Sequence, residues 1–130
     1  MSFSDYLELK VLDHVFGKAA YTMPTAYIGL STADPLDDGS GLAEPVGGAY
    51  ARVATTAVDW NAAAAGAISN ANALTFPTAT GSWGMVTHFA IFDAATLGNM
   101  LASGILTVSK TVGTGDTVKF DVGQLSATLD

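Results

Sequence analysis

The 130-residue sequence contains no cysteine and few charged residues. Without cysteine the chain can form neither a disulfide framework nor a thiolate metal site. Charged side chains make up 13% of the residues, whereas an ordinary soluble domain has roughly 25%. The sequence therefore indicates either a surface rich in Ser, Thr, Asn and Ala, or a surface that partner proteins partly cover.

Basic residues are especially scarce, with 5 Lys and Arg against 12 Asp and Glu, which gives a net charge of −7. A protein that wraps nucleic acid needs clustered basic side chains, so we expect no nucleic-acid partner. No apolar run approaches the roughly 20 residues of a membrane span, so no membrane is expected either. The first five residues include an acidic residue and no basic one, and they predict no secretory signal. We expect a protein that is made and used in the cytoplasm, or one that joins an assembly built there.

The N-terminal segment carries the signals of a helix over residues 5–16. Ser4 is a good N-cap, Asp5 and Glu8 suit the first turn, and Gly17 suits the residue after the end. Apolar residues at helical spacing form one stripe, which consists of Leu7, Val11, Leu12, Val15 and Phe16.

Beyond this helix the hydrophobic period changes to two, which is typical of strands. The pattern predicts a single domain over residues 1–130, in which an all-β body, 25–130, follows the helix. Turn signals every 8 to 12 residues favour an antiparallel, jelly-roll-like β-sandwich. The expected elements are strands at 26–31, 50–57, 68–76, 85–92, 100–109, 117–122 and 125–129, a helical turn at 61–66, a hairpin turn at 113–116 and a long loop at 33–48.

Two of these strands give sharper expectations. In 117–122, Val118, Phe120 and Val122 are expected to point inward. The strand at 85–92 is apolar on both faces, one with Met85, Thr87, Phe89 and Ile91 and the other with Val86, His88, Ala90 and Phe92. A half-exposed strand would be polar on one face. The second face is therefore covered either by other parts of the chain or by another subunit.

The acidic loop resembles a calcium-binding loop only in part. Asp34, Asp38 and Gly39 fit three of its positions, but Leu36 and Pro45 occupy two that need oxygen ligands. We expect a solvated loop with Asx-type hydrogen bonds. Whether residues 34–44 hold a cation stays open, and no metal or other cofactor is predicted.

Other catalytic patterns are also missing from the sequence. The two histidines, His14 in the helix and His88 in a strand, stand apart and form no metal-ligand cluster. We expect His14 to lie at the surface and His88 to be packed with a hydrogen bond to the backbone. The chain has neither a nucleophile elbow nor a phosphate-binding loop, so we predict that it is not an enzyme.

Three larger side chains are candidates for structural or binding roles. Trp60 and Trp83 lie near turns, where they either close the end of the core or bind sugars or proteins. Arg52 lies in a strand and is either exposed or paired with a carboxylate such as Asp59 or Asp93.

Several phrases of the sequence together resemble a family of small virion proteins of tailed bacteriophages. The most specific phrase is residues 83–93, Trp-Gly-Met-Val-Thr-His-Phe-Ala-Ile-Phe-Asp. The others are residues 27–32 with the acidic loop after them, 47–52, 76–79 and 115–120. Members of this family are described either as tail-fibre proteins or as head decoration (cement) proteins.

The resemblance implies a structural role in the virion. We expect a decoration protein, made in the host cytoplasm, that binds across capsid-subunit junctions on the outer surface of the expanded head. Its partners would be the major capsid protein and its own copies, as a dimer or trimer. The alternative is a tail or fibre component or adaptor that binds glycans, and a third reading, a small glycan hydrolase, rests only on the presence of acidic residues.

We expect the N-terminal helix or the 33–48 loop to make the contact with the capsid, because both lie at the periphery of the predicted sandwich and the loop is long enough to reach. With the aromatic candidates and His88 added, the predicted partner-binding residues are Leu7, Val11, Leu36, Asp37, Asp38, Leu42, Trp60, Trp83 and His88.

Overall fold

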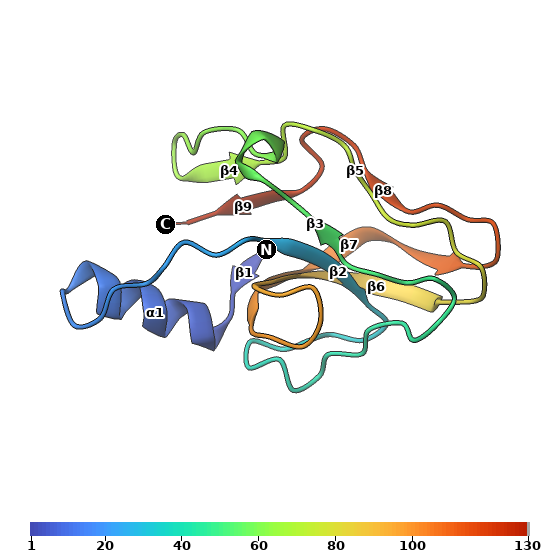
Figure 1. Cartoon of the computed structure of the whole chain (residues 1–130), viewed down its shortest axis with the longest axis horizontal. Helices are drawn as coiled ribbons and strands as arrows, with labels where there is room; N and C mark the ends of the chain where they lie inside the picture. The colour runs from blue at the N-terminus through green and yellow to red at the C-terminus, as the bar shows by residue number, and fades with distance from the viewer. Residues whose placement is uncertain (130) are drawn as a thin grey trace.

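The structure, a computed structural model, describes residues 1–129 and is built around one antiparallel sheet (Figure 1). The strand order in this sheet is β1-β7-β6-β2-β3. The strands are β1 (Ser2–Phe3), β2 (Tyr27–Ser31), β3 (Val53–Ala54), β6 (Gly84–Phe92) and β7 (Met100–Val112). Two short ribbons pair β4 (Ala67–Ser69) with β9 (Ser126–Thr128), and β5 (Leu74–Thr75) with β8 (Lys119–Phe120).

The main core lies between the large sheet and the segments that carry the two ribbons. Ile28, Ile91 and Leu101 enter this core from the sheet, whereas Phe76 and Leu125 enter it from the opposite layer. The mainly antiparallel β fold is thereby confirmed, with a single helix, α1 (Asp5–Val15), at the N-terminal end of the described chain. The second layer consists of two ribbons, where a complete jelly roll would have a second full sheet.

The central pair β6–β7 contains a bulge between Val86 and His88. Val86 pairs with Lys110 but His88 pairs with Ile105, so β7 carries extra residues at this point. Val86 and Phe89 both belong to the main core, so the expected assignment of these two residues to opposite faces is wrong.

The second face of β6 is covered by the chain itself near the end of the strand. Ala90 and Phe92 form a small core with Met100. Tyr27 from β2 and Leu42 from the long loop pack against it. Of the two alternatives for this apolar face, cover by the same chain is the one that the structure shows here.

Several local expectations need correction. The strand expected over 50–57 is reduced to β3 and a 3₁₀ turn, η1 (Ala57–Asp59). Residues 61–66 form no helix, because Ala65 and Gly66 adopt positive φ angles of 52° and 76° and close a tight turn. Val122 is 63% exposed because β8 ends at Phe120.

The 113–116 segment is a turn, but the strands on its two sides do not pair with each other. The backbone N–H of Gly113 donates to an Asp116 carboxylate oxygen, 2.9 Å away, which closes the turn. The strand that follows, β8, pairs with β5, while β7 pairs with β6. The expectation of a hairpin at this position is therefore wrong.

Helix α1 has the predicted ends. The Ser4 hydroxyl oxygen accepts from the N–H of Leu7 at 3.2 Å and donates to the carbonyl of Met100. At the other end Gly17 has a φ of 74°, and the N–H of Lys18 donates to the Asp13 carbonyl. No residue of α1 is buried, and Figure 1 shows the helix projecting from the β body.

Candidate interaction surface

The base of α1 and the 33–48 loop meet on one surface. The backbone N–H of Asp5 donates to the carbonyl of Asp37 at 3.0 Å. Beside this contact lies a depression of about 500 Å³, which Asp5, Asp37, Asp38 and Leu42 help to line. The structure thus brings together the helix and three of the predicted loop residues.

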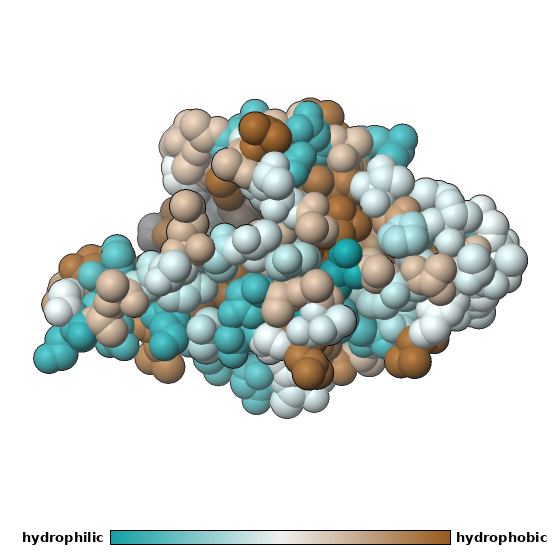
Figure 2. Space-filling model, viewed as in Figure 1, coloured by the Kyte–Doolittle hydropathy of each residue, from teal (hydrophilic) through white to brown (hydrophobic). Residues whose placement is uncertain are grey.

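The outward face of α1 is apolar and uncovered within the described chain. Leu9, Leu12 and Phe16 are 65%, 54% and 74% exposed. Together with Asp5 they follow the spacing i, i+4, i+7 and i+11, which places them on one face of a helix. We call Leu9, Leu12 and Phe16 the outer stripe, and Asp5 continues its line at the base of the helix. Figure 2 shows hydrophobic surface on the projecting helix.

The two predicted helix residues lie on a different face from the outer stripe. Leu7 packs against the main core and is partly buried, and Val11 is also partly buried. The predicted apolar stripe contained Leu12 and Phe16 together with these two residues but did not contain Leu9. The missed signal is that Leu9 precedes Leu12 by three residues and Phe16 by seven, a second helical period.

Few contacts hold the helix in place. The ring of Tyr6 packs against the main core next to Leu7. Near its other end, the N–H of Tyr21 donates to Nδ1 of His14 at 3.0 Å, which ties the returning chain to the helix. Helix α1 is therefore anchored at its first turn and by the segment that follows it, and its outward side is free within residues 1–129.

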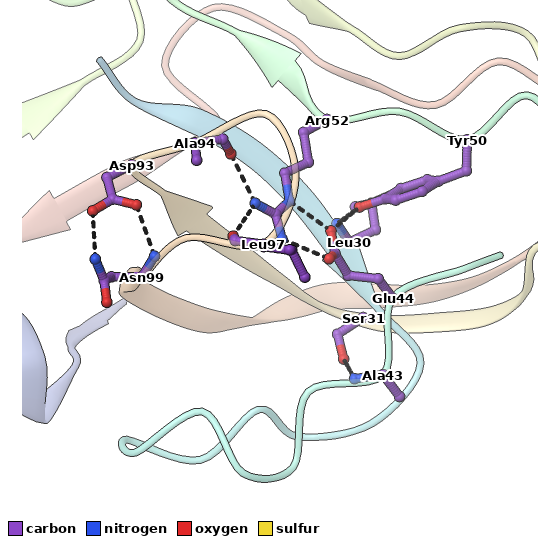
Figure 3. Close-up of polar contacts among 10 residues, drawn as sticks. All are labelled: Leu30, Ser31, Ala43, Glu44, Tyr50, Arg52, Asp93, Ala94, Leu97 and Asn99. Atoms are coloured by element: carbon purple, nitrogen blue, oxygen red, sulfur yellow. Dashed lines mark hydrogen bonds and ion pairs between the residues drawn. The ribbon is translucent and has the colours of Figure 1, made fainter. Parts of the chain in front are cut away.

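A buried arginine fixes the loops beside this surface (Figure 3). The guanidinium of Arg52 donates to both carboxylate oxygens of Glu44, at 2.9 and 2.7 Å. It also donates to the carbonyls of Ala94 and Leu97 and lies 3.4 Å from the ring centroid of Phe92. The Arg52 side chain is only 4% exposed, and its charge is balanced inside the protein by the carboxylate of Glu44.

Tyr50 completes this network. Its hydroxyl donates to Glu44 at 2.7 Å and accepts from the N–H of Leu30 at 2.9 Å. Partial burial alone would raise the pKa of Glu44, but the bonds from Arg52 and Tyr50 and the charge of Arg52 hold that pKa below its usual value. Burial also raises the pKa of Tyr50, so its hydroxyl stays protonated as a donor.

The predicted partners of Arg52 were wrong, and its partner is Glu44. Asp93 instead accepts from the N–H and the side-chain amide of Asn99. Asp59 accepts from the N–H of Thr56 at the start of η1. Sequence reasoning missed Glu44 because only the folded path of the 33–48 loop brings it to Arg52.

The acidic loop contains the expected Asx-type hydrogen bonds. Oδ1 of Asp34 accepts from the N–H of Leu36, and Oδ1 of Asp38 accepts from the N–H of Ser40. The latter bond lowers the pKa of Asp38. Leu36 is half exposed and adopts a φ of 62°. Within residues 1–129, no three His, Asp or Glu side chains are grouped as metal ligands would be.

The remaining predicted residues do not line the depression at α1. Trp83 is 3% exposed, and its indole N–H donates to the Gly48 carbonyl at 2.8 Å, so it is part of the core. Trp60 is partly buried, and its indole N–H donates to the hydroxyl of Thr55. His88 is partly buried and bonds to the Thr87 hydroxyl, not to the backbone as expected.

This fold and surface define a small β-structured protein with an exposed helical arm. The chain belongs to the family described as Podophage GP4 fiber I protein gp80, whose sequence profile matches residues 2–128. Membership makes it a structural protein of the phage virion, in agreement with the resemblance noted from the sequence. A comparison with curated proteins gives no match. No helix of residues 1–129 has the length and apolar character that spanning a membrane requires.

Proposed function

We propose that this chain is a non-catalytic structural subunit of a phage fibre and attaches to the rest of the virion through α1 and the 33–48 loop. The observation that carries this proposal is the outer stripe of α1, an apolar helix face that the described chain leaves uncovered. The family description, which names a fibre protein, supports the fibre as its location.

The two parts of the molecule suit this role mechanically. The β body has a continuous core and a closed Arg52–Glu44 network, so it can transmit load as one unit. The helical arm projects from the body, where it can enter a neighbouring protein. A chain that binds the assembled particle more tightly than its free subunits would stabilise that particle by mass action.

Head decoration is the second candidate function. It is favoured by the form of the described residues, which make a β body with no extended shaft. In that case the partner would be the major capsid protein, and copies of the chain would form dimers or trimers at the symmetry axes of the head.

Glycan binding at the two tryptophans receives less support. The Trp83 ring is in the core, in edge-to-face contact with Tyr50 and Phe76, and it has no free face for a sugar. Trp60 alone would have to provide the stacking surface.

The copy number in purified particles tests the proposal. Quantitative mass spectrometry against the major capsid protein is expected to give about three to a dozen copies, or a small multiple of that number. A count in the hundreds, in fixed proportion to the capsid subunit, would favour head decoration instead. Absence of the chain from purified particles would contradict both functions.

A further inference from the structure

We infer that the outer stripe of α1 inserts into an apolar groove of another virion protein and that the rim of this groove is basic. This inference rests on the proposed structural function and adds the chemistry of the partner. Helix α1 is the inserted element, and the β body remains outside the groove.

The spacing of the stripe is that of a helix bound in a groove. Leu9, Leu12 and Phe16 are related as i, i+3 and i+7, the arrangement by which amphipathic helices anchor in apolar grooves. All three are more than half exposed. Large apolar side chains that gather on one helix face mark an interaction site, whereas scattered ones do not.

Charge identifies the kind of groove. Glu8 and Asp13 are exposed on α1 next to the apolar stripe. At the base of the helix the line of the stripe continues to Asp5, beside Asp37 and Asp38 in the depression. The acidic side chains therefore surround the apolar residues at the sides and at one end, and Lys or Arg residues at the groove rim would complement them.

Within residues 1–129 the ion pairs are Arg52–Glu44 and Lys119–Asp121, and neither includes an acid of α1 or the carboxylates of Asp37 and Asp38. Lys10 lies over the ring of Tyr6, 5.4 Å from its centroid, and so is directed away from the stripe. Arg52 lines the depression, but its guanidinium is fully paired with Glu44 and two carbonyls. The positive charge must therefore come from the partner.

The same charges disfavour other occupants. A second copy would bring the same acidic flanks, and the net charge of −7 adds to the repulsion. An anionic membrane surface or a nucleic acid would be repelled for the same reason. A protein groove with a basic rim is the occupant that fits both the apolar and the acidic residues.

The test follows the incorporation of tagged chains into particles. Host cells express the tagged protein during infection, and tagged copies per purified particle are counted by mass spectrometry. One variant combines Leu9→Ser with Phe16→Ser, and a second combines Glu8→Lys with Asp13→Lys. Matched controls are Val58→Ser, which is 74% exposed on η1, and Asp121→Lys in an exposed ion pair.

Both α1 variants are expected to lose at least about tenfold in incorporated copies, because they remove apolar anchors or place like charges against the rim. Both controls are expected to match the tagged wild type. Because no residue of α1 is buried, both variants are expected to keep the wild-type fold. Thermal unfolding of the purified variants checks this.

Three results would overturn the inference. In the first, the α1 variants are incorporated like wild type. In the second, Glu8→Lys with Asp13→Lys increases incorporation, which indicates an acidic rim. In the third, light scattering shows that Leu9→Ser with Phe16→Ser dissociates an oligomer of the purified chain, which indicates a second copy in the groove. Each leaves the virion role intact, whereas absence of the wild-type chain from particles would defeat the proposed function itself.

Discussion

The Arg52 network and the outward face of helix α1 differ in how far their side chains are buried and paired. The positive charge of Arg52 is enclosed, because its side chain is only 4% exposed. Its guanidinium donates hydrogen bonds to groups of the same chain. In α1, apolar side chains such as Phe16 face solvent, and no residue is buried. The side chains that stabilise the fold are therefore distinct from the exposed side chains of α1 that are available to a partner. The Arg52 network maintains the fold, whereas the outer stripe of α1 contributes little to it.

The largest expected effect comes from Arg52→Met. It leaves the Glu44 carboxylate with only the Tyr50 hydroxyl as a donor and leaves two carbonyls without theirs, and the free energy of unfolding should fall by about 3 kcal/mol. Urea denaturation measures this loss. Lys119→Met, which breaks an exposed ion pair with Asp121, is the control and should cost less than about 1 kcal/mol. Similar losses in the two variants would contradict the assigned role of Arg52.

The pH dependence of stability should come next in size. Because the pKa of Glu44 is lower in the folded protein than in the unfolded chain, its contribution is complete above the ordinary pKa of a glutamate. It is lost as the pH falls through the lowered value of the folded state. Urea denaturation at several pH values from neutral to strongly acidic should show this loss, and it should not exceed that of Arg52→Met. In Glu44→Gln the acid slope should become shallower, and an unchanged slope would show that Glu44 is not responsible.

Removal of the helix cap should have a smaller and more local effect. Ser4→Ala deletes the acceptor for the N–H of Leu7 and the donor to Met100, at an expected cost of about 1 kcal/mol. Hydrogen exchange of the first-turn amides of α1 should accelerate. The exposed Ser126 on β9 provides the control, since Ser126→Ala should leave these amides unchanged. Equal exchange in both variants would show that the cap does not hold the helix.

The smallest effect on stability is expected in the outer stripe. Leu9→Ser combined with Phe16→Ser should change the free energy of unfolding by less than about 0.5 kcal/mol, because both side chains already face solvent. Urea denaturation provides the measurement. Val86→Ser, at a core position that is 0% exposed, should be far more destabilising. A large loss in the stripe variant would mean that α1 supports the fold after all.

The features that could be predicted from the sequence are local ones. The cap at Ser4, the stop at Gly17 and the Asx turns of Asp34 and Asp38 depend on residues a few positions apart. The class of fold followed from the alternation of apolar residues over whole strands. Spacing along the chain was enough to predict the cap, the helix stop and the Asx turns, because their hydrogen bonds join residues a few positions apart.

The features that were missed depend on tertiary structure. The pairing of Arg52 with Glu44 depends on the path of the 33–48 loop, whose Leu42 packs against the small core that contains Phe92. The irregular pairing of β6 with β7 beside Val86 depends on residues about twenty positions apart, so no local pattern predicts it. The outer stripe was partly predicted, but its direction depends on which face of α1 Leu7 uses to contact the core.

Hydrogen exchange on intact particles would test the docking surface most directly. Exchange in residues 5–16 and 36–39 is compared between the purified chain and the chain in the virion, with residues 57–69 as the internal reference. We expect slower exchange on assembly in the first two segments and unchanged exchange in the reference. Unchanged exchange in α1, together with protection elsewhere on the β body, would contradict this expectation.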